Sequence, residues 1–570
     1  MKKHLSLVLT LAMVIAMLTA CGSTGNSSVD SGTAGSETTT TSETAAPEAA
    51  ASEAATAEAD TASVAEAASA VEKVDSSDLY PVSEETIHLT GVAPQEPMLV
   101  AYQEDLSEEY AQVTAEERTN VSVDWNVSNV DTYMDNITIM LSSGDIPDLM
   151  LTPENYFGID YLVDQELFLD LMEYLPTDAP DFYALYQSDE VFAKEITSDT
   201  GKVVTMRGRF QLPNSMLGIR QDWLDAMDLK TPTTYDELTE VLTALHNEYN
   251  TPNTISFLST GFMSNASILT GGYGVATPEN NDLPWQVDDE GNVIMSYTLD
   301  GYKDYLEMVH GWYEAGLFND EFLSASNPGI PDGWMVAGET ALFATRSASF
   351  SASYAGTVDD ENFVLACMAD VTKTGTETIT LGDSRSITAS GGMAVSAQCE
   401  YPEEAIKYLN WYFTDEGFYA ANFGEEGVTY TKNDDGSIAY TDFLLNNPDG
   451  LSYKNALGLY TSYFGVGFDE SDERTTASFS LETEKEMYDV WRSNRSEANV
   501  YHGTLNTEES TQYSSISSDM ITMASTKIMG YIMGTESLDT YDEFVETLYS
   551  MNLDTLVSLK QAAYDRYLAR

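Results

Sequence analysis

The sequence predicts an α/β protein whose folded part divides into two lobes or more. Between Thr86 and Thr152, apolar residues follow strand spacing and helix spacing in turn, in the order strand, helix, strand, helix, strand. This order is typical of a parallel sheet with crossover helices. About 490 residues follow residue 79, whereas a single core stops growing at about 250 to 300 residues. More than one core is therefore expected.

Local patterns predict the individual elements. Thr234 and Glu237 have the spacing of a capping box, and the helix that they begin carries leucine and valine on one face. Two helices close the chain, and the first of them is expected to be capped by Thr540 and Glu543. The predicted strands are 86–92, 121–127, 147–152 and 341–344, and the other predicted helices are 110–117, 130–141, about 302–316 and one from Pro402 onward.

The N-terminus has the layout of a lipoprotein signal peptide. Lys2 and Lys3 form a positive head, an almost unbroken apolar run extends to Leu18, and small residues precede Cys21. The stretch Leu18-Thr-Ala-Cys21 resembles a bacterial lipobox, in which the cysteine is diacylated and signal peptidase II cuts before it. We therefore expect residues 1–20 to be removed and Cys21 to carry the lipid. The alternatives are an ordinary cleaved signal and a membrane span, for which the run is short against about 20 residues.

A polar segment follows the expected lipid anchor. Residues 21–79 consist mainly of alanine, serine, threonine and glutamate, without a large apolar cluster. Such a composition cannot bury enough apolar surface to offset the entropy of ordering, so we expect a disordered acidic tether. The tether would suspend residues 80–570 from the extracytoplasmic face of the cell membrane.

The net charge excludes several kinds of partner. The chain has 93 acidic and 25 basic residues and a formal net charge of −68, and a field of this sign repels nucleic acid and anionic lipid. We expect no nucleic-acid partner and no membrane contact beyond the lipid. The charge favours neutral or cationic ligands, unless the acidity only keeps an exported protein soluble.

Nothing in the sequence requires a metal, a cofactor or a disulfide. Cys367 and Cys399 are too far apart for a C-x-x-C motif, and both have apolar, strand-like surroundings typical of buried cysteines. A disulfide between them stays open as an alternative, because an exported compartment permits it. The acidic turns at 288–292 and 433–437 are predicted to be hairpin turns, since neither has alternating calcium ligands closed by a distal glutamate.

Several motifs along residues 80–570 occur in the order and spacing of a known family. They are Ser143-Gly-Asp-Ile-Pro-Asp148, Gly218-Ile-Arg-Gln-Asp-Trp-Leu-Asp225, Lys230-Thr-Pro-Thr-Thr-Tyr-Asp-Glu-Leu238, Tyr313-Glu-Ala-Gly-Leu317 and Tyr401-Pro-Glu-Glu-Ala-Ile406. On these motifs the chain resembles the bacterial extracellular solute-binding proteins of ABC importers, family 1, in the lipoprotein branch called LplA-like. It departs from many relatives at 246–253, where an acidic loop suited to calcium is replaced by His246-Asn-Glu-Tyr-Asn-Thr-Pro-Asn253.

The resemblance implies a two-lobe fold of the periplasmic-binding-protein type II. Each lobe would be a mostly parallel sheet flanked by helices, the first beginning with about residues 80–213, and a ligand would be trapped in the cleft between them. The implied role is not enzymatic. A monomeric lipoprotein captures a small solute, most often a carbohydrate or oligosaccharide, and delivers it to the permease subunits of an ABC transporter.

Two other functions stay open. A surface-anchored glycoside hydrolase would need a carboxylate pair, which leaves no spacing motif, although the sequence contains no H-E-x-x-H, G-x-S-x-G or Walker motif. A carbohydrate-sensing or adhesion lipoprotein would use the same anchor and tether. A neighbouring pair of permease genes would favour uptake over either alternative.

The candidates for ligand contact are residues that follow predicted strands, residues at a predicted strand-to-helix transition at 220–223, and Trp285, which is expected in a loop. In open α/β sheets, ligands bind outside the carboxyl ends of the strands, where tryptophans can stack on sugar rings and polar groups can bind hydroxyls. Each candidate also has a structural alternative, such as a core position for Trp223 and an ion pair of Arg220 with Asp222. The candidates are Gln95, Glu96, Glu154, Asn155, Arg220, Asp222, Trp223, Trp285 and Arg346.

Overall fold

The computed structural model describes most of the chain after residue 73. The described residues are 74–95, 102, 106–155, 157–209, 216–256, 268–278, 282–318, 322, 329–345, 358, 360, 362–381, 391–449, 451, 453–461, 465–469, 471–479, 482–491, 495–496 and 498–570. All belong to one unit of the chain, residues 67–570, and the other unit comprises residues 1–66. The predicted signal peptide at 1–20, Cys21 and the tether up to residue 73 lie outside the described residues, as do Glu96 and Arg346.

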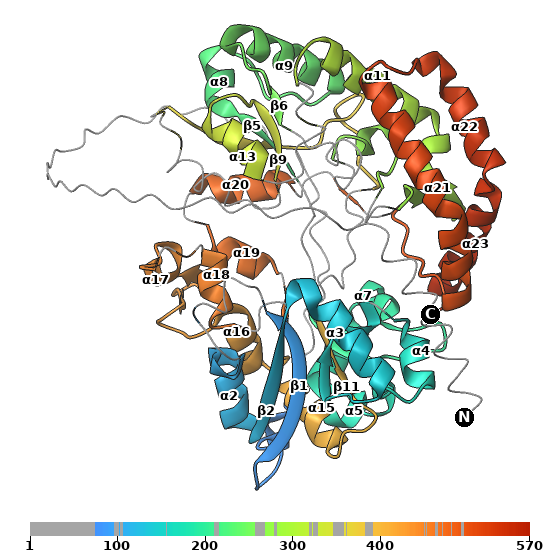
Figure 1. Cartoon of the computed structure of the whole chain (residues 1–570). Helices are drawn as coiled ribbons and strands as arrows, with labels where there is room; N and C mark the ends of the chain where they lie inside the picture. Colours follow the sequence, from blue (N-terminus) through green and yellow to red (C-terminus); the bar gives the residue numbers. More distant parts are fainter. Residues whose placement is uncertain are drawn as a thin grey trace, which may run out of the picture. The chain divides into compact units, whose positions relative to one another are not determined.

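The first lobe is built on a five-stranded sheet with the strand order β2-β1-β3-β11-β4 (Figure 1). β1 pairs in parallel with β2 and β3, and β11 is antiparallel to β3 and β4. The predicted order of strands and helices between Thr86 and Thr152 is confirmed. The elements are β1 (Ile87–Gln95), α2 (Tyr110–Thr119), β2 (Val121–Asn129), α3 (Val130–Ser143), β3 (Leu149–Leu151), β4 (Thr205–Arg207) and β11 (Gly392–Val395).

The side chains of β2 explain how this sheet packs. Val121, Val123 and Trp125 are buried and alternate with more exposed residues, as expected for one face of a strand turned to the core. Trp125 lies opposite Gly91 of β1. A Cβ atom at Gly91 would come within 2.5 Å of the Trp125 ring, so only glycine leaves room for the indole there.

The second lobe is built on a four-stranded sheet with the strand order β10-β5-β9-β6. β5 is antiparallel to both of its neighbours, β9 and β10, and β6 is parallel to β9. The strand predicted at 341–344 is confirmed as β9. The strands are β5 (Met216–Arg220), β6 (Ile255–Ser256), β9 (Leu342–Thr345) and β10 (Leu365–Met368).

Separate sets of helices cover the two sheets and close a separate core over each. In the first lobe they are α4 (Ile159–Asp164), α5 (Leu175–Asp178), α6 (Pro180–Ser188), α7 (Glu190–Ile196), α15 (Pro402–Trp411) and α16 (Asp415–Phe423). In the second lobe they are α8 (Gln221–Ala226), α9 (Tyr235–Tyr249), α11 (Asp300–Glu314), α13 (Gly329–Val336) and α20 (Glu482–Trp491). The two large cores, one over each sheet, confirm the expectation of more than one core.

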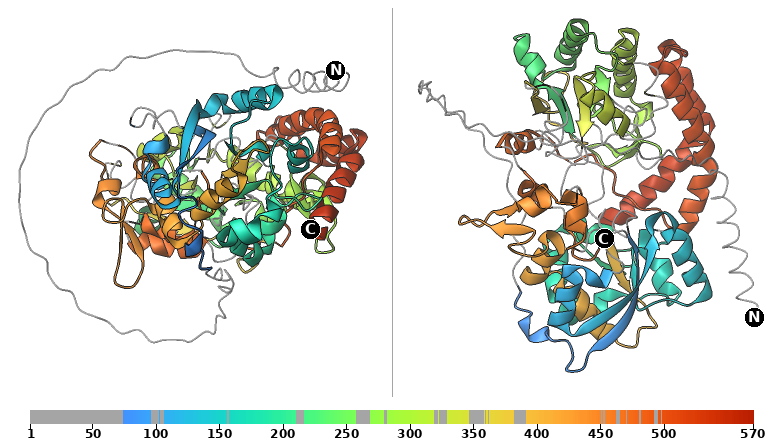
Figure 2. Two further views of the ribbon diagram at one scale, coloured as in Figure 1. Left: turned by 90° about the horizontal axis from the view of Figure 1, so that it is seen from below. Right: turned by 60° about the vertical axis from the view of Figure 1, so that its left-hand side comes forward.

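Three further groups of elements complete the fold. The first is the hairpin of β7 (Trp285–Val287) and β8 (Val293–Met295), and the second is a small cluster of β12 (Tyr430–Lys432), β13 (Ile438–Tyr440), α17 (Asp442–Leu445), α18 (Tyr453–Gly458) and α19 (Asp472–Ala477). The third group is α21 (Thr507–Ile532), α22 (Tyr541–Ser550) and α23 (Leu553–Ala569). Figure 2 shows these last three helices side by side, and α21 also packs on α11.

Most of the predicted local features are present. The capping box of Thr234 and Glu237 begins α9, and the turns at 288–292 and 433–437 join antiparallel hairpins. The cap expected at Thr540 is wrong, because its hydroxyl donates to the carbonyl oxygen of Ser537 within a preceding 3₁₀ turn. Cys367 in β10 and Cys399 after β11 are both free thiols, so the alternative of a disulfide between them does not hold.

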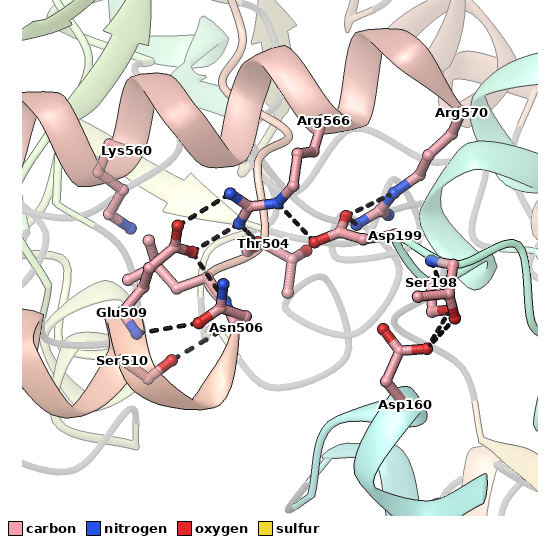
Figure 3. A network of polar contacts seen from close by, with 12 residues as sticks. Asp160, Ser198, Asp199, Thr504, Asn506, Glu509, Ser510, Lys560, Arg566 and Arg570 are labelled. Atoms are coloured by element: carbon pink, nitrogen blue, oxygen red, sulfur yellow. Dashed lines mark hydrogen bonds and ion pairs between the residues drawn. The ribbon is translucent and has the colours of Figure 1, made fainter. Parts of the chain in front are cut away.

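An ion-pair network connects the C-terminal helix to the first lobe. Arg566 of α23 donates to Glu509 of α21 at 2.8 and 2.5 Å, and its Nε donates to Asp199 at 2.5 Å. Arg570 donates to the other oxygen of Asp199 at 2.6 Å. Figure 3 shows Arg566 between the two carboxylates, with Asp199 next to Ser198, whose hydroxyl donates to Asp160 of α4. The end of α23 is thereby fixed to the segment that follows α7.

Replacing Arg566 with methionine is expected to lower the free energy of unfolding by about 1 kcal/mol. The substitution removes both ion pairs of a side chain that is 28% exposed, so part of their strength is already screened by water. The loss should shrink at about 1 M salt, where the screening length is only about 3 Å. Urea unfolding at low and high salt measures it. Lys485→Met is the control, because its ion pair with Asp489 is 69% and 67% exposed and should contribute almost nothing.

Candidate functional site

In each sheet, the strand directions identify the edge at which the chain passes from one lobe to the other. We call each such passage a crossing and this edge the crossing edge. In the first lobe, the carboxyl ends of β1 to β4 meet the amino end of β11. The chain leaves that edge after Arg207 and returns to it at Gly392. In the second lobe, the chain enters at Met216, which lies opposite Thr345 at the carboxyl end of β9. The carboxyl ends of β6 and β10 lie at the same edge, and such edges are where α/β sheets bind ligands.

Glu154 occupies the edge of the first lobe. It lies in a 3₁₀ turn directly after β3, and Thr152 just before that turn has a φ of +49°. A left-handed backbone conformation is strained for a β-branched residue, and such strain is concentrated at functional sites. Thr152 is held in place because its N–H donates to the carbonyl oxygen of Gly392 at 2.6 Å. The turn directs Glu154 past the end of β11 towards β4, the next strand but one in the sheet.

Glu154 forms a buried ion pair with Arg207 at the end of β4. The distance from Nη1 of Arg207 to Oε1 of Glu154 is 3.3 Å, and the two side chains are only 5% and 8% exposed. The hydroxyl of Thr205 donates to the same carboxylate oxygen at 2.9 Å. Oε2 of Glu154 is also buried, and it has no hydrogen-bond partner among the described residues. The site therefore offers one buried acceptor that the described protein does not satisfy.

Burial dominates the protonation of Glu154. Removal from water raises the pKa of its carboxyl group, and the nearby charge of Arg207 and the Thr205 hydrogen bond act in the opposite direction. A buried carboxyl with a raised pKa and one open oxygen is typical of functional sites.

The residues after β4 are held by the segment 465–469. Arg209 lies 3.5 Å from Asp469 and 3.7 Å from Asp189. Gly208 packs directly on the backbone of Phe468, since a Cβ atom there would come within 1.6 Å of the Phe468 carbonyl oxygen. These contacts fix the direction in which the chain leaves the first sheet.

A second buried ion pair occupies the corresponding edge of the second lobe. Asp370 follows β10, and it accepts from Nε and Nη2 of Arg495 at 2.6 and 2.8 Å. The side chains are 2% and 6% exposed. Burial raises the pKa of Asp370 and the charge of Arg495 opposes that rise. Arg495 also belongs to an isolated bridge with Ile379, so the pair joins three segments at this edge.

The structure places three candidates at the edge of the first lobe. Glu154 is fully described there. Gln95 is the last residue of β1, and Asn155 lies in the turn after β3, but their side chains are not among the described ones. Glu96 and Arg346 lie outside the described residues.

Arg220, Asp222 and Trp223 lie at the opposite edge of the second sheet, which corrects their expected position. β5 is antiparallel to its neighbours, so Arg220 lies opposite Leu365 at the start of β10. Arg220 donates to Asp222 at 2.8 and 2.5 Å, and its guanidinium lies 4.1 Å from the Trp223 ring centre. The structural alternative of an ion pair beside a core ring describes this arrangement, and we leave these three residues out of the site.

Trp285 belongs to the separate hairpin of β7 and β8 and not to the four-stranded sheet. It is 8% exposed in the core of the second lobe, and its indole N–H donates to the hydroxyl of Tyr513 at 2.8 Å. The ammonium group of Lys560 lies 5.7 Å from its ring centre. Trp285 was expected in a loop, but it begins the strand β7 and joins the hairpin to α21 and α23.

The sequence interpretation missed Thr205, Arg207, Asp370 and Arg495. One signal was available for Arg207, which ends the short apolar run Val203-Val-Thr-Met206. A charge at the end of such a run must be paired or lie at the edge of a core. Its partner Glu154 is distant in sequence, so no local pattern indicates the pair.

A cavity of about 550 Å³ lies in the first lobe beside the segment that leaves β4, and it is bordered by Gly208, Arg209 and Asp469 as well as by Tyr80, Arg118, Trp411 and Glu416 among others. Arg118 and Glu416 form an ion pair across its wall at 2.7 Å.

Over the described ranges, no three metal-ligating side chains converge, and none of the helices combines the length and apolarity needed to cross a bilayer.

Comparison with known proteins relates the chain to others of the same architecture. Residues 96–417 match the family described as bacterial extracellular solute-binding protein. The fructooligosaccharide ABC transporter substrate-binding protein FusA of Streptococcus pneumoniae serotype 4 is 22% identical over 488 residues, covering 80% of this chain and 86% of FusA. Lipoprotein LipO of Bacillus subtilis is 27% identical over 206 residues, a match that spans 33% of this chain and only 37% of LipO.

The likeness extends to solved structures. The alginate-binding protein AlgQ2 superimposes with a TM-score of 0.65 at 20% identity, covering 85% of this chain and 99% of AlgQ2. This likeness confirms the predicted two-lobe fold of type II. The family match covers more than half of the sequence, and this chain therefore belongs to the bacterial extracellular solute-binding proteins.

Proposed function

We propose that this protein binds a carbohydrate, most simply an oligosaccharide, between its two lobes and delivers it to the permease of an ABC importer. The observation that carries the proposal is Glu154, a buried carboxylate with an open acceptor at the strand edge facing the lobe crossings. Saccharide hydroxyl groups are donors that such an oxygen can accept. The similarity to FusA, a fructooligosaccharide ABC transporter substrate-binding protein, extends over 80% of this chain and supports the same class of solute.

The location that we propose is the extracytoplasmic face of the cell membrane, with a lipid on Cys21 and a tether up to about residue 79. The lipobox-like stretch before Cys21 and the likeness to a lipoprotein support it. We further propose that the mature protein is a monomer without enzymatic activity. Its intact mass should correspond to a chain that begins at Cys21 and carries lipid.

Thermal unfolding of the purified protein tests the proposal, with mono- and oligosaccharides, amino acids and peptides as ligands and with product analysis of each mixture. A ligand that binds only the folded state stabilises it by about 2.7 kcal/mol at a hundredfold excess over its dissociation constant. One saccharide that shifts unfolding and is recovered intact would support the proposal. Recovery of cleaved saccharide would replace it with a glycoside hydrolase. A shift with amino acids or peptides alone would replace the solute class.

A further inference from the structure

The arginines at the crossing edges are already neutralised by carboxylates. Arg207 pairs with Glu154, and Arg495 pairs with Asp370 in two short hydrogen bonds. Arg209 lies within ion-pair distance of two carboxylates, those of Asp189 and Asp469. Each positive charge described at these edges therefore has an acidic partner from the protein itself. The charge of each of these arginines is therefore already balanced, which weakens its attraction for an anionic ligand.

The open oxygen of Glu154 selects for a hydrogen-bond donor. A buried polar atom without a partner is destabilising, so a ligand that supplies a donor gains affinity by satisfying it. A neutral sugar presents hydroxyl groups that can donate. The carboxylate of a uronic acid can only accept, and its charge repels that of Glu154.

The charge of the whole chain acts in the same direction. With a net charge of −68, the protein repels anionic solutes before they reach the site, and this repulsion lowers their association rate. Local and global electrostatics therefore both disfavour acidic saccharides. Proteins of this fold differ in whether their saccharide is neutral or acidic, because FusA is named for fructooligosaccharides and AlgQ2 for alginate.

We propose that the solute is a neutral saccharide and that Oε2 of Glu154 accepts a hydrogen bond from one of its hydroxyl groups. This inference rests on the proposed function and narrows its substrate class. The ion pair with Arg207 keeps Glu154 at the end of β4 with only one oxygen engaged, and the second oxygen remains available to the ligand. The charge of the same carboxylate disfavours saccharides built from uronic acids.

Calorimetric titration of the full-length protein tests this inference with matched probes. The neutral probes are fructo-, malto- and galacto-oligosaccharides, and the acidic probes are oligogalacturonates and oligomers of alginate of the same lengths. We expect at least one neutral probe to bind and no acidic probe to bind. Tighter binding of an acidic probe would overturn the neutral-solute inference and leave the carbohydrate proposal in place. If no saccharide binds and a non-carbohydrate does, both the neutral-solute inference and the carbohydrate proposal are overturned.

The variant Glu154→Gln tests the role of the carboxylate. It keeps an acceptor of similar shape but removes the charge that strengthens the hydrogen bond, so binding of the neutral probe should weaken about tenfold. The same change leaves Arg207 without this opposite charge, so affinity for oligogalacturonates should increase. Unchanged affinities for both probes would refute the assignment of Glu154. If the variant fails to fold, the comparison of neutral with acidic probes on the unaltered protein still decides the solute class.

Asp178→Asn is the matched control. Asp178 at the end of α5 pairs with Lys407 of α15 at 3.1 Å, and these side chains are 13% and 21% exposed. The substitution removes a partly buried carboxylate from an ion pair. This ion pair lies in the same lobe as Glu154, but it joins two helices and is not at the strand ends. The affinity for the neutral probe and the discrimination against oligogalacturonates should both stay unchanged.

Discussion

Arg495→Met is expected to lower the free energy of unfolding by about 3 to 5 kcal/mol. The substitution removes two hydrogen bonds and the opposite charge from Asp370, whose side chain is 2% exposed. A buried carboxylate that loses its cation either remains charged in a poor environment or takes up a proton, and both cost stability at neutral pH. Urea unfolding at pH 7 measures the loss.

The loss should depend on pH with a defined sign. Burial already raises the pKa of Asp370 in the native protein, with Arg495 opposing it, so the variant has a still higher pKa in the folded state. A folded pKa above that of the unfolded chain favours the fold at low pH. The destabilisation should therefore be smallest near the unfolded value of about 3.9 and grow as the pH rises towards neutrality. A loss that does not change between pH 4 and pH 8 would contradict this account.

The double variant Asp370→Leu with Arg495→Met separates the ion pair from packing. Apolar residues of similar volume often replace a buried ion pair at little cost, so the double variant should recover most of the stability that Arg495→Met loses. A double variant as unstable as the single one would show that contacts of Arg495 other than those to Asp370 dominate.

Gly208→Ala is expected to lower the free energy of unfolding by about 1 to 3 kcal/mol. The added Cβ would lie 1.6 Å from the carbonyl oxygen of Phe468, and two backbone segments can only separate to make room. The same displacement reaches the adjacent Arg207 and its ion pair with Glu154, so solute affinity should fall as well. Thermal unfolding with and without the bound saccharide measures both effects.

Gly311→Ala is the control for Gly208→Ala. Gly311 lies within α11, and a Cβ atom there would have no heavy atom within 4 Å. Alanine in a helix interior is favoured over glycine by about 0.5 to 1 kcal/mol, so this variant should be slightly more stable and bind the solute normally. A Gly208→Ala variant that behaves like Gly311→Ala would show that segment 465–469 does not constrain the chain after β4.

The sequence predicted those parts of the structure that depend on neighbouring residues. The alternation of Val121, Val123 and Trp125 predicts β2, and the pair Thr234 and Glu237 predicts the start of α9, because both patterns reflect hydrogen bonding and burial within a few residues. The motif order predicted the family and hence the two-lobe fold. Thr540 failed as a cap because a 3₁₀ turn directly before the helix engages its hydroxyl instead.

The site depended on distances that local patterns do not contain. Strand-end reasoning selected Glu154, which follows a strand of the parallel set, and it also selected Arg220, which ends a strand antiparallel to its neighbours. Strand direction is decided by how the chain enters a sheet, which is a property of the whole lobe. Asp370 and Arg495 are 125 residues apart, and no spacing rule could join them.

The sequence by itself determined the order of elements, the two cores and the acidic character that disfavours anionic partners, because these follow from composition and short-range periodicity. Only the tertiary structure decided which charges meet. It paired Glu154 with Arg207 and Asp370 with Arg495 at the edges that face the crossings, and it placed Arg220 with Asp222 at the far edge. The physical reason is that buried charges must find partners in space, and chain topology alone brings those partners together.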